Sequence, residues 1–196
     1  MEFLDSPYFI HAVAVLLVLL YWEAREIFTS IADKKKGQHG ALPRLLIRLI
    51  LPVVGAGIIL QLLGLVPAAV ALPEVFEEPL RILGQLVFWG GFLLAFWARE
   101  TIGRHWAHAA EYQVVKSQDL VTDGPYAYIR HPIYTALFAI FLGAQMLTST
   151  WLILLTPLLY WFIHWQASKE EELLIKKFKK KYRDYQAGTG MILPRI

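Results

Sequence analysis

Five long apolar segments limit what this chain can fold into more than any other feature. They cover residues 8–22, 45–66, 80–97, 132–147 and 151–165. A helix that crosses a bilayer needs about 20 mostly apolar residues, because the hydrocarbon core is about 30 Å thick. Hydrophobic residues make up 57% of the chain and charged residues only 18%, which is unlike an average soluble domain. The sequence therefore predicts an all-α integral membrane protein with about five transmembrane helices.

The last two apolar segments predict a tight helical hairpin, because only Thr148, Ser149 and Thr150 separate them. A connection this short makes the two helices antiparallel neighbours. No internal repeat or low-complexity linker divides the chain. We expect a single membrane domain over residues 1–196. Residues 1–98 would form the N-terminal spans, and residues 99–196 a polar loop, the hairpin and a C-terminal helix.

An amphipathic C-terminal helix is predicted behind the hairpin, over residues 169–185. Apolar side chains recur there at spacings of four, four and three, at Leu174, Phe178, Tyr182 and Tyr185. This is the period of an apolar stripe on one helix face, and lysines fill the other faces. The helix should end near Gly188 and Gly190, with Pro194 preventing its continuation.

The distribution of charge predicts how the chain is oriented. Lysines and arginines gather in the connections 25–44, 99–130 and 169–195, which lie on one side if the spans alternate. The other side carries acidic residues and, among basic ones, Arg81. By the positive-inside rule the N-terminus lies outside, and the C-terminus and the polar site lie in the cytoplasm. The net charge of +3 thus has a topological origin that needs no nucleic acid, although anionic membrane lipids would be attracted.

The N-terminal residues and the cysteine content narrow the possible processing and chemistry of the chain. Residues 1–7 carry Glu2 and Asp5 in place of a basic leader region, so the first apolar segment is expected to be retained. The chain has no cysteine, which excludes disulfides, thiolate zinc sites and a cysteine nucleophile. The pair His105 and His108, with Glu111, is weak evidence for a metal site, and we predict no metal.

Polar side chains converge where the predicted hairpin opens. Arg130 and His131 precede its first helix, and Glu170 and Glu171 follow its second, so the hairpin brings all four to one membrane depth. Charged groups at the rim of a hydrocarbon layer are costly unless they are paired or put to use. A structural interpretation also exists, because arginine often snorkels at the rim and acidic residues favour the start of a helix.

The motifs around these residues resemble the isoprenylcysteine carboxyl methyltransferase family, which is related to the phospholipid N-methyltransferases. The resemblance covers roughly residues 100–196. It is carried by Gly124-Pro125-Tyr126, by Arg130-His131-Pro132-Ile133-Tyr134, by Glu170-Glu171, and by Phe178, Tyr182 and Tyr185.

This resemblance implies an S-adenosylmethionine-dependent methyltransferase that acts on a lipophilic small-molecule or lipid acceptor. It assigns cofactor binding to Leu120, Val121, Gly124, Tyr126, His131, Tyr134 and Glu171, and catalysis to Arg130 and Glu170. The cofactor chemistry agrees, because carboxylates suit its sulfonium and ammonium and arginine suits its carboxylate. An amine or thiol acceptor would have to lose a proton, for which Glu170 and His131 are the available bases.

Three positions depart from the family pattern. Ala136 and Lys179 stand where glycine is common. Gln166 stands where the carboxyl methyltransferases have an arginine that pairs with the substrate carboxylate. Because glutamine cannot neutralise an anion, we hypothesise a neutral or cationic acceptor, such as a lipid amine, a thiol or a phenol-like hydroxyl.

Two other functions fit the same architecture. One is a membrane reductase of the sterol type that uses a reduced nicotinamide dinucleotide, although additional basic residues for a 2′-phosphate are not evident. The other is a non-enzymatic membrane scaffold whose rim charges are purely structural. Binding of S-adenosylhomocysteine, compared with the reduced dinucleotide, distinguishes these from a methyltransferase.

Overall fold

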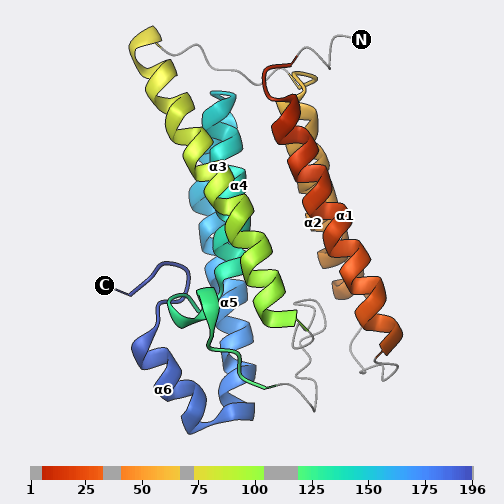
Figure 1. Cartoon of the computed structure of the whole chain (residues 1–196), viewed down its shortest axis with the longest axis vertical. Helices are drawn as coiled ribbons and strands as arrows, with labels where there is room; N and C mark the ends of the chain where they lie inside the picture. The colour runs from red at the N-terminus through yellow and green to blue at the C-terminus, as the bar shows by residue number, and fades with distance from the viewer. Residues whose placement is uncertain (1–5, 33–40, 67–72, 104–118, 196) are drawn as a thin grey trace. The chain divides into compact units, whose positions relative to one another are not determined.

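The structure, a computed structural model, describes residues 6–32, 41–66, 73–103 and 119–195 (Figure 1). Its elements in chain order are α1 (Phe9–Ala32), α2 (Ala41–Leu62), α3 (Glu74–Ile102), the 3₁₀ turn η4 (Gly124–Ala127), α4 (Pro132–Leu147), the 3₁₀ turn η5 (Trp151–Leu155), α5 (Thr156–Phe178) and α6 (Lys180–Gly188). Within the described residues no strand forms, and Ile129 and Gly190 form an isolated parallel bridge. The prediction of a helical fold is therefore confirmed.

Membrane-spanning character is clearest in α3. Among the described residues, its stretch Val75–Ile102 is long and apolar enough to cross a bilayer. Shorter apolar helices cover Phe9–Ala24, Pro52–Leu62 and Pro132–Leu147. Five membrane crossings, and a hairpin that spans the bilayer, stay predictions.

Contacts along the chain group it into two compact units. The first comprises Met1–Gln85 and Gly143–Ile153, and the second comprises Leu86–Leu142 and Leu154–Ile196. The side chains that the sequence places at a common site all belong to the second unit. A single domain over the whole chain stays a prediction.

In the first unit, α1 and α2 pack closely. A β-carbon at Gly55 would lie 2.7 Å from Leu19 Cδ1, so the absence of a side chain lets the two helices approach. A buried polar cluster lies in the same unit. Gln61 Nε2 donates to Gln145 Oε1 over 2.9 Å, and Thr150 Oγ1 donates to the same oxygen over 2.6 Å. Such side-chain hydrogen bonds between helices are typical of apolar surroundings.

In the second unit, α4 packs between α3 and α5. At Gly91 of α3 a β-carbon would lie 2.9 Å from the backbone oxygen of Ala136, so the glycine on α3 makes room for the alanine on α4. On the other side, an apolar cluster joins α4 to α5 and to the end of the chain. Its buried members are Ile163, Ala167 and Ile192, and Tyr134, Phe138, Leu159 and Met191 pack against them.

The C-terminal helix differs from its prediction, because it is broken. The sequence predicts one helix over residues 169–185, but α5 continues past the acidic pair to Phe178, and α6 starts at Lys180. Between them Lys179 has φ 50° and ψ −120°. A residue with a β-carbon rarely adopts these backbone angles, whereas glycine adopts them readily. Lys179 therefore makes this turn at a cost in backbone strain.

Lys179→Gly is therefore expected to stabilise the protein by about 1 kcal/mol. The relief of backbone strain, about 1–3 kcal/mol, exceeds the extra freedom of glycine in the unfolded chain, about 0.4–1 kcal/mol. An equilibrium unfolding titration in mixed detergent micelles measures the change. Lys181→Gly inside α6 is the matched control and should destabilise instead, because glycine is a poor helix former. Destabilisation by both variants would contradict the strain at Lys179.

Candidate functional site

The loop before α4 is shaped by Gly124 and Tyr126. Gly124 has φ 56°, and a β-carbon there would lie 2.9 Å from Thr101 Oγ1 on α3, so glycine suits both the turn and the contact. Gly124 begins the turn η4, in which the Tyr126 side chain is buried. The Tyr185 hydroxyl on α6 donates to the backbone oxygen of Tyr126 over 2.6 Å. The loop is thus tied to α3 at one end and to α6 at the other.

Residues Thr189–Ile192, which we call the C-terminal strap, lie along the residues that precede α4. Arg130 N donates to the backbone oxygen of Gly190 over 2.8 Å, and His131 N donates to that of Met191 over 3.0 Å. Thr135 Oγ1 donates to the backbone oxygen of Ile192 over 2.6 Å. These bonds fix the backbone from which the Arg130 and His131 side chains project.

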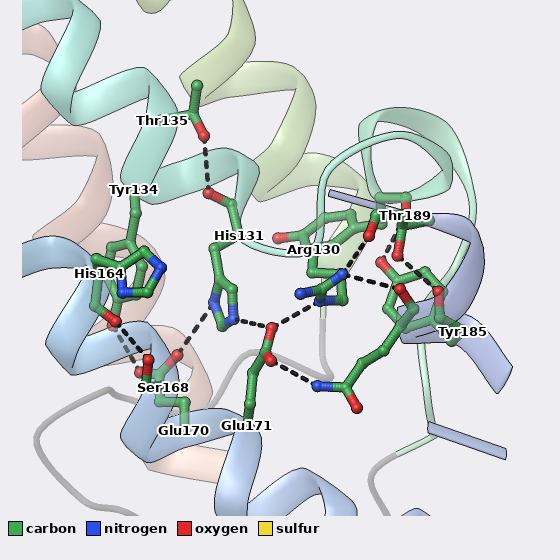
Figure 2. Close-up of polar contacts among 12 residues, drawn as sticks. Arg130, His131, Tyr134, Thr135, His164, Ser168, Glu170, Glu171, Tyr185 and Thr189 are labelled. Atoms are coloured by element: carbon green, nitrogen blue, oxygen red, sulfur yellow. Dashed lines mark hydrogen bonds and ion pairs between the residues drawn. The ribbon is translucent and has the colours of Figure 1, made fainter. Parts of the chain in front are cut away.

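Arg130, His131, Glu170 and Glu171 form one ion cluster (Figure 2). Arg130 Nε donates to Glu171 Oε1 over 2.6 Å. His131 lies between the two carboxylates, with Nε2 3.3 Å from Glu171 Oε1 and Nδ1 3.5 Å from Glu170 Oε2. The structure therefore brings together the four side chains that the sequence placed at a common site. Their roles in catalysis and cofactor binding stay predictions.

The surroundings of His131 favour its charged form. The Nε2 contact with Glu171 and the 3.5 Å Nδ1 contact with Glu170 both favour the imidazolium, because neutral imidazole has an N–H on one ring nitrogen only. Burial alone would lower the pKa of His131, but the hydrogen bonds and charges of Glu170 and Glu171 outweigh burial and raise the pKa above its usual value. A histidine that keeps its proton is a poor general base, so Glu170 is the better candidate of the two bases.

Both carboxylate oxygens of Glu171 are occupied by hydrogen bonds from other residues of the protein. Its Oε1 accepts from Arg130 and His131, and its Oε2 accepts from Gln186 Nε2 over 2.6 Å. Burial raises the pKa of this carboxyl, but the His131 and Arg130 donors and charges outweigh burial and lower the pKa to about 2. Glu171 is thus an ionised carboxylate that holds its neighbours in place. Its direct contact with a cofactor stays a prediction.

Glu170 is the more open of the two carboxylates. Its side chain is 23% exposed, compared with 6% for Glu171. The Tyr134 hydroxyl donates to Glu170 Oε1 over 2.6 Å, while the Tyr134 ring stacks on His131 with ring centroids 5.5 Å apart. Among the residues that the structure describes, Glu170 Oε2 contacts His131 Nδ1 at 3.5 Å, and this oxygen can also accept a hydrogen bond from a ligand.

The other predicted site residues lie on the loop. Leu120 and Val121 are half-buried in the extended stretch before η4. His105, His108 and Glu111 lie outside the described residues. Within the residues that the structure does describe, no three histidine, aspartate or glutamate side chains group so as to hold a metal ion.

The sequence missed two contacts of Arg130 with α6 and the strap. Arg130 Nη1 donates to the backbone oxygen of Gln186 over 3.3 Å and also to that of Thr189. Gln186 further donates to Glu171 through its amide. Backbone carbonyls leave no signal in a sequence. The position of Gln186 directly after the predicted stripe residue Tyr185 was the single available hint.

Comparisons with known proteins agree with the motifs. The sequence model described as "Phospholipid methyltransferase" matches residues 80–181, just over half of the chain, and this range contains the whole ion cluster. The protein-S-isoprenylcysteine O-methyltransferase of Schizosaccharomyces pombe is 35% identical over 96 residues, which cover 48% of this chain and 41% of that protein. The nickel-cobalt-cadmium resistance protein NccN of Alcaligenes xylosoxydans xylosoxydans is 31% identical over 97 residues, 49% of this chain and 45% of that one.

A solved structure supports the fold. The eukaryotic intramembrane Ras methyltransferase ICMT matches with a TM-score of 0.51 at 21% identity, over 99% of this chain and 70% of that one. At this identity the likeness shows the fold alone. The chain spans less than half the length of the Schizosaccharomyces pombe relative. The matched range nevertheless covers η4, α4 and α5 without interruption, and the resemblance seen in the motifs is confirmed: the chain belongs to the phospholipid methyltransferase family.

Proposed function

We propose that this protein is an integral membrane methyltransferase that uses S-adenosylmethionine to methylate a lipophilic acceptor. The observation that carries the proposal is the ion cluster of Arg130, His131, Glu170 and Glu171, which lies inside the residues matched by the family. Two cations and two carboxylates balance in charge there, and one carboxylate stays accessible. The composition and the apolar stretch Val75–Ile102 support a membrane location.

The donor set suits S-adenosylmethionine. The accessible oxygen of Glu170 can accept from an ammonium or from ribose hydroxyls, and Tyr134 offers an aromatic ring beside it. Leu120, Val121 and Gly124 would supply a loop wall with Tyr126. The bound cofactor would supply a methyl group activated on a sulfonium. In the predicted orientation the N-terminus lies outside, and the C-terminus and the site lie on the cytoplasmic side of the membrane.

Glu170 would act as the general base for an acceptor that must lose a proton. Its side chain is open to a ligand, whereas His131 is held as an imidazolium and Glu171 is paired with Arg130. Arg130 and Glu171 would keep the site in shape, and orientation of the reacting groups can supply up to about 7–11 kcal/mol of the barrier reduction. Apolar side chains of α4 and α5 next to the cluster would exclude water.

A neutral or cationic acceptor fits the site better than a carboxylate. The Arg130 guanidinium is held by Glu171 and by two backbone carbonyls, so it is poorly placed to neutralise an acceptor. Gln166, one helical turn before Glu170, is buried and uncharged. We therefore propose a lipid amine, a thiol or a phenol-like hydroxyl as the methylated group.

Methyl transfer can be tested directly on the purified protein. A lipid extract is incubated with the protein and a methyl donor that carries a deuterated methyl group, and the products are analysed by mass spectrometry. A labelled lipophilic product is expected, and heat-treated protein is the control. A farnesylated cysteine analogue, offered beside long-chain amines and thiols, tests the acceptor class. Strong preference for the cysteine carboxylate would overturn the acceptor class, and binding of the reduced nicotinamide dinucleotide in place of S-adenosylhomocysteine would overturn the reaction.

A further inference from the structure

Helix α6 reaches the ion cluster through Gln186. The amide Nε2 donates to Glu171 Oε2 over 2.6 Å, and the backbone oxygen of the same residue accepts from Arg130 Nη1 over 3.3 Å. Gln186 therefore contacts both members of the Arg130–Glu171 ion pair. Arg183 and Asp184, its neighbours on α6, are exposed.

The two carboxylate oxygens of Glu171 accept different numbers of hydrogen bonds. Oε1 accepts from Arg130 and from His131, whereas Oε2 accepts from the Gln186 amide. A carboxylate that is held at one oxygen can rotate about its terminal bond. Held at both oxygens, it presents Oε1 to both cations in one geometry. The Gln186 bond is a hydrogen bond to a charged group, the stronger class of such bonds.

We propose that Gln186 is a positioning residue of the methyltransferase site, and this inference rests on the proposed function. Its amide fixes the orientation of the Glu171 carboxylate. Glu171 in turn holds Arg130 and His131, and His131 holds Glu170 in the position where it can accept from the ligand. Gln186 acts entirely through these neighbours and need not touch the ligand.

With glutamate in place of Gln186, the contact with Glu171 depends on pH. A protonated carboxyl can donate to Glu171 as the amide does, whereas an ionised carboxylate cannot donate and repels it. The titratable or charged groups that face the Glu171 carboxylate are Arg130 and His131 ahead of α4, Glu170 beside it on α5, and Tyr182 and Tyr185 on α6. All of them are the same in the variant and in the unchanged protein, so a difference between the two pH profiles reports the introduced carboxyl.

The test is the affinity for S-adenosylhomocysteine, measured by calorimetry on the full chain in detergent from pH 4, just below the ordinary glutamate pKa of about 4.3, to pH 8.5. Gln186→Glu is expected to bind nearly as well as the unchanged protein at the acidic end. At the alkaline end it should bind about 10- to 100-fold more weakly, which is the effect expected for a hydrogen bond to a charged group. Arg183→Gln, on the exposed part of the same helix, makes the same change in net charge and should follow the unchanged protein at every pH.

Gln186→Leu provides a second variant in case the glutamate variant unfolds at alkaline pH. It removes the donor without adding charge, so its binding should be weaker by a similar factor at all pH values. A profile of Gln186→Glu parallel to that of the unchanged protein, or full affinity in Gln186→Leu, overturns the positioning role alone. Failure of the unchanged protein to bind S-adenosylhomocysteine overturns the proposed function, and this inference with it.

Discussion

Replacing Glu171 by leucine is expected to lower the free energy of unfolding by about 3–5 kcal/mol, the cost of breaking a buried ion pair on one side. The Arg130 and Glu171 side chains are 10% and 6% exposed, so water cannot substitute for the lost carboxylate. The change also removes the acceptor for His131 Nε2 and for the Gln186 amide. Binding of S-adenosylhomocysteine should be lost together with stability, because the group that holds Arg130 and His131 is gone.

The neighbouring residue offers a matched control. Glu172 lies next to Glu171 on α5, but its side chain is 57% exposed and its partner is Lys169, also exposed, at 3.0 Å. Exposed ion pairs contribute about 0–1 kcal/mol, so Glu172→Leu should change stability by less than about 1 kcal/mol. Equilibrium unfolding in mixed detergent micelles measures both variants. Equal stabilities for the two leucine variants would show that the buried ion pair does not hold the site.

The helical elements of this protein could be predicted because their signals are local. Helix α4 spans Pro132–Leu147, the same residues as the fourth apolar segment. Proline begins a helix readily because its missing N–H would be unbonded in the first turn, and the polar residues 148–150 end the apolar run. Apolar composition therefore located this helix to the residue.

The break at Lys179 could not be predicted from periodicity. Leu174, Phe178 and Tyr182 keep the spacing of one helix across it, although α5 ends at Phe178 and α6 starts at Lys180. The available signal was the departure from the glycine that the resemblance implies here, since the backbone of Lys179 has a conformation that lysine adopts only under strain. The position of this helix break is therefore set by tertiary packing and not by local helix propensity.

The core of the candidate site was predictable for a geometric reason. The prediction rested on a short connection between two helices, which would bring their far ends together, and the structure does bring Arg130 and His131 next to Glu170 and Glu171. The strap and Gln186 were not predictable. They reach the site through the turn at Lys179 and through backbone carbonyls of Thr189 and Gly190, and neither feature leaves a side-chain pattern. At Gly190 a β-carbon would also collide with the backbone oxygen of Leu193, a requirement that appears only in the folded strap.

Stability is expected to be greatest between about pH 4.5 and 6.5, because the two ends of the ion cluster titrate in opposite directions. The pKa of Glu171 falls from an ordinary 4.5 to about 2 on folding, so its contribution is present above pH 4.5 and is lost as the pH falls toward 2. A shift of this size corresponds to about 3 kcal/mol. The pKa of His131 is raised above its ordinary 6.5, so its contribution is complete below that value and is lost as the pH rises through the raised pKa.

Each limb of this profile can be assigned by one variant. Unfolding titrations from pH 3 to 9 should show that Glu171→Gln flattens the acid limb, since the glutamine does not titrate. His131→Asn should flatten the alkaline limb, although both variants are less stable than the unchanged protein at pH 6. Glu172→Gln is the control and should keep both limbs, because that side chain is exposed. An alkaline loss of stability that persists in His131→Asn would contradict the imidazolium between the two carboxylates, and with it the assignment of Glu170 as the base.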